Sequence, residues 1–160
     1  MPYHEMPENI KVVEAIAPQA GGAITGDYVT LRDTGVCLVL VHINQENVAS
    51  VAITIEQATD VSGTGSKAIT THVPIWANPD CAASDSLVRQ TDGVSFTTSD
   101  ALTHKLVAFQ IDPAHLDVNN GFDCITVKTA PSDPSNITAA QYFLDDLRYG
   151  GATPPSDTVD

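Results

Sequence analysis

The sequence predicts an all-β protein, an antiparallel β-sandwich of the jelly-roll type with extended terminal arms. Three observations favour this class. Short segments rich in Val, Ile, Leu, Thr and Tyr recur at near-regular spacing, Val51–Gln57 alternates strictly between apolar and polar side chains, and helix signals are thin. This pattern is typical of a sandwich or barrel and not of strands that alternate with helices.

About ten segments have the composition of strands and are bounded by turn residues. They are Lys11–Ile16, Asp27–Leu31, Val36–Ile43, Val51–Gln57, Ala68–Ala77, Ser86–Gln90, Val94–Thr98, Lys105–Ile111, Phe122–Thr129 and Gln141–Tyr149. In the fourth segment, Val51, Ile53 and Ile55 share one face, as expected of a half-buried strand. Val36–Val41 is apolar on both faces, so we expect a central strand that is covered on both sides.

The segment Asn136–Leu147 allows two interpretations. Its alanines and leucines could line a helix, whereas Tyr142 and Leu144 suit a final strand. We favour the strand because an all-β chain needs a partner for its last edge. Helix signals are thin, and the segments that could each form a single turn are Ser84–Leu87, Ser99–His104 and Pro113–Val118.

The turns between the strands have recognisable chemistry. In Thr59–Ser66, Asp60 and Ser62 can bond nearby backbone amides, and two glycines can adopt positive φ without a steric cost. Arg32–Gly35 and Gln90–Gly93 are two further tight turns, and the second carries the Asp-Gly signal of a hairpin.

The two ends differ from the middle of the chain. We expect an N-terminal arm at residues 1–10, a sandwich domain at 11–149 and a flexible C-terminal tail at 150–160. The first part holds prolines and no periodicity, and Pro154 and Pro155 cannot donate to a sheet ladder. No targeting signal is visible, and the longest apolar run is too short for a transmembrane helix.

Charge and cysteine content exclude several classes of partner. The chain has 20 Asp and Glu against 7 Lys and Arg, for a net charge of −13. Such a charge argues against binding to nucleic acid or to an anionic membrane. Cys37, Cys81 and Cys124 lack zinc-site spacing, and the first and last lie in apolar segments that suit free buried thiols. A reducing compartment, the cytoplasm in which the chain is made, fits best.

Two loops match ligand-binding motifs in part of their residue order but not in the residues that must follow. Gly63–Ala68 fits the dinucleotide fingerprint, but a β-branched segment closed by Pro74 follows where a helix is required, so a hairpin turn explains the glycines. Asp117–Asp123 suggests a calcium loop, but Lys128 stands where an EF-hand needs a bidentate Glu. An acidic surface loop is the simpler interpretation, and an irregular calcium site stays open.

The sequence contains no recognisable set of catalytic residues. The histidines, which are His4, His42, His72, His104 and His115, fall in no metal-binding spacing, and no nucleophile elbow is present. Asp145 and Asp146 are adjacent, so on a strand they face opposite sides. We therefore predict no catalytic residue, cofactor or metal ligand, although two glycosidase acids would need no local motif. The chain is expected not to be an enzyme.

Several segments are similar to those of small β-sandwich virion proteins encoded among the head genes of tailed bacteriophages. They are Ala49–Thr70, Asn9–Ala17, Val73–Asn78, Phe109–Val118 and Phe122–Thr129. The resemblance implies a virion component, a decoration (cement) protein on the capsid exterior whose partners are the major capsid protein and further copies of itself. It transfers no functional residue, because these motifs are strand-and-turn patterns. We expect a homo-oligomer, with a trimer as the first expectation.

Two other functions remain open at this stage. A head–tail connector or tail structural protein would share every compositional feature. A carbohydrate-binding β-sandwich would need exposed aromatic side chains on one face, and the chain has four Tyr, four Phe and one Trp, among them Trp76.

Overall fold

The computed structural model describes residues 5–151 and residue 156. Parts of the two predicted arms, residues 1–4, 152–155 and 157–160, therefore lie outside the described residues. Where the N-terminal arm is described, Met6–Asn9 forms a short helix, α1, which the sequence did not predict. This helix lies beside the first and last strands of the fold.

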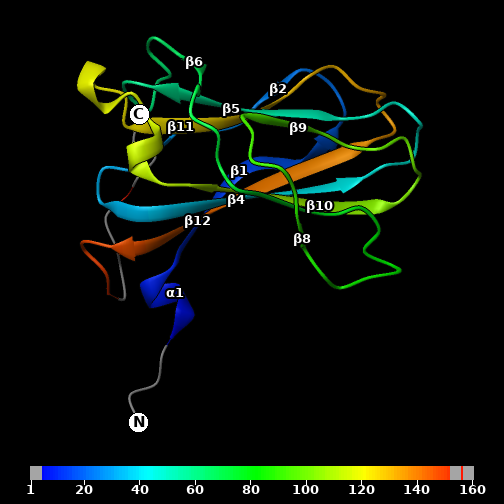
Figure 1. Cartoon of the computed structure of the whole chain (residues 1–160), viewed down its shortest axis with the longest axis horizontal. Coiled ribbons are helices and arrows are strands. Elements are labelled where there is room, and N and C mark those ends of the chain that lie inside the picture. The colour runs from blue at the N-terminus through cyan, green and yellow to red at the C-terminus, as the bar shows by residue number, and fades with distance from the viewer. Residues whose placement is uncertain (1–4, 152–155, 157–160) are drawn as a thin grey trace.

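The described chain forms two antiparallel six-stranded sheets, and the first of them is sheet A. In spatial order, sheet A contains β1 (Lys11–Ala20), β12 (Ile137–Leu147), β4 (Thr34–Asn44), β10 (His104–Ile111), β7 (Ile75–Asn78) and β8 (Val88–Arg89). It is the lower layer in Figure 1.

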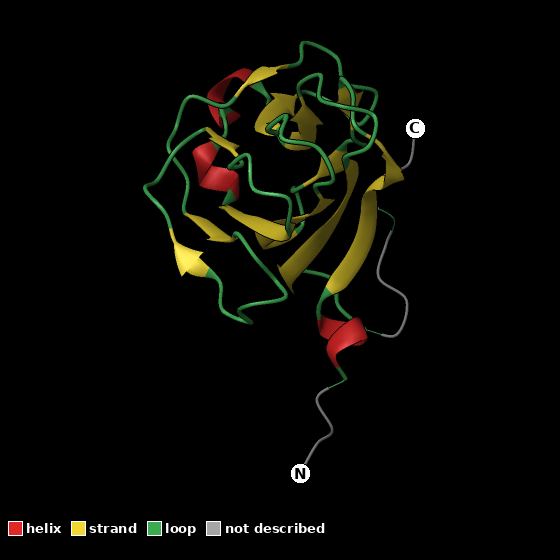
Figure 2. Cartoon of the chain, turned by 90° about the vertical axis from the view of Figure 1, so that its right-hand side faces the viewer, coloured by secondary structure: helices red, strands yellow, loops and turns green. Residues whose placement is uncertain are grey.

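The second sheet, sheet B, is the upper layer in Figure 1. It contains β2 (Ile24–Thr25), β3 (Val29–Thr30), β11 (Cys124–Thr129), β5 (Ala52–Ala58), β6 (Lys67–Ala68) and β9 (Ser95–Thr97). Two single-turn 3₁₀ helices, η1 (Pro113–His115) and η2 (Val118–Asn120), join β10 to β11. Strands and loops dominate the second view, and the helices are short (Figure 2).

The strand pairing is nested, which is the defining property of a jelly roll. β1 pairs with β12, β2 and β3 with β11, β4 with β10, and β5 with β6 and β9. The outermost strands of the sequence are thus partners, and each next pair lies inside the previous one, as when a long hairpin is wrapped round a core. The predicted all-β antiparallel sandwich is confirmed.

Several predicted strands have different bounds. Of the predicted strand Asp27–Leu31, only Val29–Thr30 forms a strand, β3, and a separate short strand, β2, precedes it across a break at residues 26–28. The predicted strand Ala68–Ala77 is two strands in different sheets, β6 and β7, because Pro74 and the residues before it do not continue the ladder. The ambiguous segment Asn136–Leu147 is a strand, β12, as favoured.

The turn predictions had mixed success. The Asp-Gly hairpin at Gln90–Gly93 is wrong, since β8 belongs to sheet A and β9 to sheet B. No helical turn forms at Ser84–Leu87 or Ser99–His104, whereas η1 confirms the turn expected within Pro113–Val118. In η1 the side chain of Asp112 caps the backbone N–H of Ala114 at 2.9 Å.

The inner faces of the two sheets form one hydrophobic core. Its members include Val39, Val41, Ile43, Ile53, Ile55, Ile75, Phe109, Ile111, Ile125, Val127, Tyr142 and Leu144. Cys37 and Cys124 are buried and free, as predicted, and burial raises the pKa of the Cys124 thiol to about 12. Buried neutral thiols of this kind act as small apolar side chains.

Candidate interaction surface

The outward-facing side of sheet A is rich in apolar side chains. Along β4, Cys37, Val39 and Val41 point into the core, and the intervening residues point outward. Those intervening residues are Val36, Leu38 and Leu40, and all three are half-buried. We call this surface the outer face of sheet A.

Neighbouring strands extend the outer face of sheet A on both sides of β4. By register, Leu38 lies between Phe143 of β12 and Gln110 of β10, and Val12 of β1 lies beyond Phe143. In the next row, Leu40 lies beside Ala108, which is followed by Trp76 of β7. Opposite residues of an antiparallel pair share one face, so the apolar side chains of these rows lie together, with the exposed Gln110 among them and Ala108 buried beneath its neighbours.

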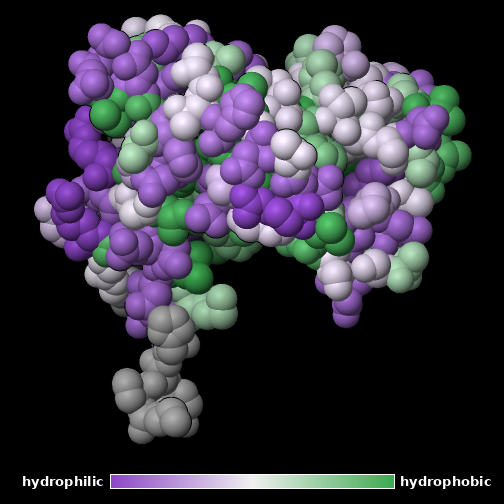
Figure 3. All heavy atoms as spheres, viewed as in Figure 1, coloured by the Kyte–Doolittle hydropathy of each residue, from purple (hydrophilic) through white to green (hydrophobic). Residues whose placement is uncertain are grey.

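A cavity of about 380 Å³ marks the part of this face that lies next to α1. It is lined by Met6, Ile10, Val36, Leu38, Phe143 and Asp145, among others. Figure 3 shows apolar residues beside α1 and a hollow between α1 and the projection that carries β8. The outer face of sheet A is therefore the floor of a groove with α1 as one wall.

The β7–β8 segment forms the other wall. The Asn78 amide donates to the Ser84 carbonyl at 2.8 Å, and the Cys81 N–H donates to the His104 carbonyl at 2.9 Å. Arg89 of β8 lies over the Trp76 ring, 4.8 Å from its centroid. These contacts hold the segment against the β7–β10 side of the sheet.

The floor of the groove is also the part of the molecule with few acids. β4, β7 and β10 contain no Asp or Glu, although the chain carries 20. The acidic outward-facing residues of this sheet, Glu14 and Asp145, lie on β1 and β12 at one side of the face. An uncharged apolar surface on such an acidic protein is typical of a binding site for another protein.

The sequence had predicted that β4 is covered on both sides, and this is wrong for its outer side. No second layer of the described residues covers Leu38 and Leu40 beyond the edge contacts of α1 and the β7–β8 segment. Phe143 was not predicted as a surface residue, because Gln141–Tyr149 was predicted only to form the strand that pairs with the edge of the sheet. The two-sided apolar pattern of β4 was the available signal.

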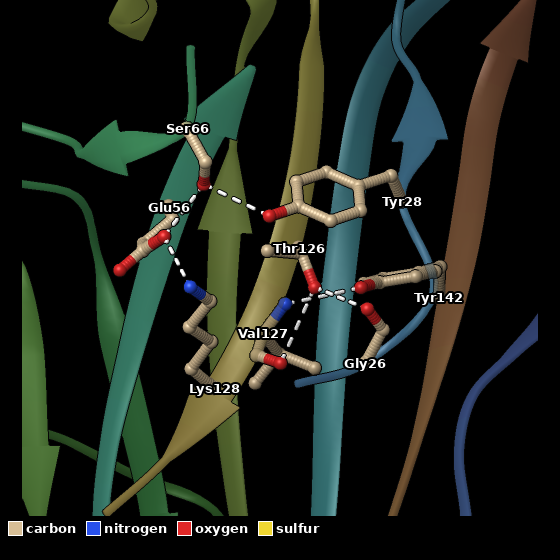
Figure 4. A network of polar contacts seen from close by, with 8 residues as sticks. All are labelled: Gly26, Tyr28, Glu56, Ser66, Thr126, Val127, Lys128 and Tyr142. Carbon is tan, nitrogen blue, oxygen red and sulfur yellow. Dashed lines mark hydrogen bonds and ion pairs between the residues drawn. The ribbon is translucent and has the colours of Figure 1, made fainter. Parts of the chain in front are cut away.

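Sheet B presents a different outer surface, where polar side chains are already paired (Figure 4). Glu56 of β5 accepts hydrogen bonds from Ser66 at 2.6 Å and from Lys128 of β11 at 2.7 Å. The Tyr28 hydroxyl donates to Ser66 at 2.9 Å. Burial raises the pKa of Glu56, but the hydrogen bonds from Lys128 and Ser66 outweigh it, so the pKa lies below its ordinary value.

The glycine-rich loop is a hairpin turn, as predicted. It joins β5 to β6, and Asp60 accepts hydrogen bonds from the N–H groups of Ser62 and Thr64, each at 3.0 Å. These bonds, led by those from Thr64, lower the pKa of Asp60. Gly63 and Gly65 have φ of +83° and +68°. No helix follows them, so the loop has no dinucleotide site.

The acidic loop at Asp117–Asp123 is held in place by an ion pair and hydrogen bonds within the protein. Asp117 forms an ion pair with Lys67 at 2.7 Å and accepts from the Asn120 amide at 2.9 Å. The hydrogen bond from Lys67 is the main reason that the pKa of Asp117 is lowered. Within residues 5–151, no three His, Cys, Asp or Glu side chains come together to hold a metal ion.

The titratable residues named in the sequence analysis lie apart from one another. His42, His72 and His104 are exposed, and His4 lies outside the described residues. The Nδ1 of His115 accepts from the Asp112 N–H at 2.9 Å, a local cap of η1. Asp146 has a left-handed φ of 54°, so the simple alternation predicted for Asp145 and Asp146 does not apply there. Lys105 is 2% exposed, and its ammonium group donates to Ala101 and Thr103.

The sequence matches no known family pattern and no curated protein. Among solved structures, the SPBc2 prophage-derived protein YomS is 11% identical with a TM-score of 0.49, over 86% of this chain and 94% of that one.

A provisionally assigned sugar binding protein from Bacteroides thetaiotaomicron VPI-5482 is 12% identical with a TM-score of 0.30, over 84% and 83% of the two chains. A chain of infectious bursal disease virus, Gx strain, is 11% identical with a TM-score of 0.26, over 85% of this chain and 40% of that one. The fold class rests on the strand pairing described above, independently of these likenesses. In the described part of the chain, no helix has the length and apolar composition that crossing a bilayer requires.

Proposed function

We propose that the chain is a structural protein of a bacteriophage virion, a capsid decoration protein that binds the outside of the head shell through the outer face of sheet A. It is made in the cytoplasm of the host bacterium. The resemblance of its strand-and-turn segments to phage head proteins supports this assignment, as does the nested sandwich fold. The function is binding and not catalysis.

The observation that carries the proposal is the apolar outer face of sheet A itself. Burying Leu38, Leu40 and Phe143 against the shell would remove their remaining exposed surface from water, at about 25 cal/mol per Å². Each single contact can be modest, since many copies on a lattice act together. The acidic remainder of the surface would keep the free protein soluble and away from nucleic acid.

A homo-oligomer, with a trimer as the first expectation, would present several such faces at once. Analytical ultracentrifugation of the full chain measures this directly. A head–tail connector or tail protein is the main alternative, and the position of the protein in the virion separates the two. The carbohydrate-binding alternative lacks support, because Tyr149 is the one exposed aromatic residue in the described chain.

Co-sedimentation with capsids tests the proposal. Undecorated capsids from the same genome would be mixed with the full chain and with Leu38→Asp, which places a charge on the groove floor. The matched control is Thr54→Asp, on the outward side of β5 in sheet B. We expect the wild type and the Thr54 variant to pellet with capsids and the Leu38 variant to remain in solution. Equal binding by all three would overturn the proposed face.

A further inference from the structure

The outer face of sheet A carries opposite charges at its two sides. One row of residues crosses all the strands of the sheet, and by register it consists of Glu14, Gln141, Leu40, Ala108, Trp76 and Arg89. The row begins with a carboxylate on β1, ends with a guanidinium on β8 and is uncharged between them. Glu14 is exposed and has no ion-pair partner within residues 5–151. Its carboxylate is therefore available to another molecule.

The guanidinium at the other end of the row is held on the same face. Arg89 lies over the ring of Trp76, the residue directly opposite it on β7, at 4.8 Å from the ring centroid. Arg89 also pairs with Asp92, but both side chains are about half exposed, and ion pairs in such positions are weak. A guanidinium has five N–H donors, so Arg89 can bind a second carboxylate at the same time.

The row is complementary to itself. A two-fold axis that runs along the strands, between β4 and β10, reverses the order of the row in a second copy. Glu14 of each copy then lies opposite Arg89 of the other copy, at both sides of the contact. Between these pairs uncharged residues meet uncharged residues, with Leu40 opposite Ala108. Sheets that pack face to face keep their strands within about 30° of each other, which this axis allows.

The two walls of the groove also suit a second copy, because they stand at diagonally opposite corners of the face. α1 lies on the side of β1 and β12, next to Val36 and Asp145. The β7–β8 segment lies on the other side, where the Cys81 N–H donates to the carbonyl of His104, the residue paired with Asn44. Val36 and Asn44 are near opposite ends of β4, and Figure 1 shows α1 and β8 below sheet A, apart from each other along the strands. The two-fold axis therefore places each wall over a corner that has no wall in the first copy.

The size of the face suits a reversible contact. β1, β12, β4 and β10 are each at least eight residues long. At about 4.8 Å between strands and about 3.4 Å per residue, they cover an area on the order of 500 Å². β7, β8 and the two walls add to this area, and a standard interface buries about 800 Å² on each partner. The face is large enough for a dimer that forms and dissociates.

We propose that the free protein associates through the outer face of sheet A as a two-fold dimer, in which Glu14 of each copy pairs with Arg89 of the other and the apolar residues between them are covered. This inference rests on the proposed function and adds a regulation of the same site, because a second copy and the head shell compete for one face. The dimer keeps the apolar groove away from water until the protein meets the shell. A larger oligomer on the shell, such as the expected trimer, then forms through other surfaces.

Analytical ultracentrifugation of the full chain tests for the dimer. We expect a monomer at low concentration and a reversible dimer as the concentration rises. Added salt should shift the equilibrium towards the monomer, because it screens exposed ion pairs. A monomer or a trimer at every concentration would overturn the inference.

Two charge reversals locate the contact. Glu14→Arg places a second positive charge opposite Arg89, and Arg89→Glu places a second negative charge opposite Glu14. Each variant alone should raise the dissociation constant of the dimer at least about tenfold, since both ion pairs change from attraction to repulsion. An equimolar mixture of the two variants should dimerise again, because one ion pair is kept and the other is restored with its charges exchanged. Asp100→Arg, at an exposed acid between β9 and β10, is the matched control and should dimerise like wild type.

Circular dichroism shows whether each variant has the fold of the wild type. A dimer that survives both single reversals, or a mixture of folded variants that stays monomeric, would contradict the inference. Capsid co-sedimentation separates it from the proposed function. If the wild type does not dimerise and Leu38→Asp still loses capsid binding, the inference fails and the proposed function stands. If the mixture dimerises but the wild type does not bind capsids, the dimer stands and the proposed function fails.

Discussion

The hydroxyl group of Tyr142 accepts a hydrogen bond from the backbone N–H of Val127 at 3.1 Å, across the interior of the sandwich. It also donates to the Asp27 carbonyl at 2.7 Å. These bonds fill a gap in sheet B, because the chain between β2 and β3 leaves the ladder where it passes Val127 (Figure 4). A side chain from sheet A thus completes the hydrogen bonding of sheet B.

Removing this hydroxyl should destabilise the fold. Tyr142→Phe would remove the partner of the buried Val127 N–H and of the partly buried Asp27 carbonyl, which we expect to lower the free energy of unfolding by about 1–3 kcal/mol. Urea denaturation measures the change. Tyr149→Phe is the matched control, since Tyr149 is 57% exposed, and it should have almost no effect. Equal stability of the Tyr142 variant and the wild type would contradict the assigned role.

Gly63 should tolerate no side chain. It combines a φ of +83° with close packing, since a Cβ would lie 2.7 Å from the Tyr28 ring. Gly121 has a similar φ of +82° but open space around it. We expect Gly63→Ala to lower the melting temperature more than Gly121→Ala, whose cost is backbone strain of about 1–2 kcal/mol. Gly22→Ala, with neither constraint, is the neutral control, and equal effects of the first two variants would refute the packing argument.

Acid should weaken the fold through carboxylates whose pKa values are lowered by folding, among them Glu56 and Asp117. A group of this kind binds protons more readily when unfolded, so its contribution is complete above the unfolded pKa and is lost as the pH falls through the folded pKa. We expect the free energy of unfolding to fall progressively as the pH drops below about 5, where the unfolded carboxylates begin to bind protons.

The variant Glu56→Gln isolates one part of this effect. It should be less stable than wild type at pH 7, by up to about 1 kcal/mol for a partly exposed ion pair, and the difference should shrink as the pH falls through the lowered, folded-state pKa of Glu56. Urea unfolding at pH 7 and over a series of acidic pH values measures it. Glu14→Gln, at an exposed acid of β1, should leave the dependence of the free energy of unfolding on pH unchanged. A Glu56 difference that persists at low pH would show that the lost interaction is not electrostatic.

Deleting residues 1–10 should leave the domain folded and weaken capsid attachment. α1 has no buried residue, but Met6 and Ile10 line the groove cavity, so the deletion removes one wall of the proposed site. Thermal unfolding and capsid co-sedimentation of the truncated chain measure the two properties. Co-sedimentation at full strength would show that this part of the chain does not contribute to binding.

Local pattern and turn chemistry predicted much of the fold. The alternation in Val51–Gln57 placed Ile53 and Ile55 in the core, and the hairpin turn at Thr59–Ser66 followed from its Asp, Ser and Gly residues. The assignment of strands to sheets was harder. β8 and β9 follow one another in sequence but lie in different sheets, and an Asp-Gly pair does not reveal that.

Polar contacts between residues far apart in the chain could not be predicted from the sequence either. Asn136 is fully buried and accepts from the N–H groups of Glu46 and Asn47, about 90 residues away in the chain. The outer face of sheet A was partly predictable, because β4 is apolar on both sides. The place of Phe143 on that face depends on strand register, and the left-handed φ of Asp146 is specified by no local pattern.

The number of copies in a purified virion tests the central claim most directly. Quantitative mass spectrometry against the major capsid protein gives this number. A decoration protein that covers the shell should be present at on the order of hundreds of copies. A count of about six or twelve, as in the ring-shaped assemblies of a neck or tail, or absence from the virion, would contradict the account.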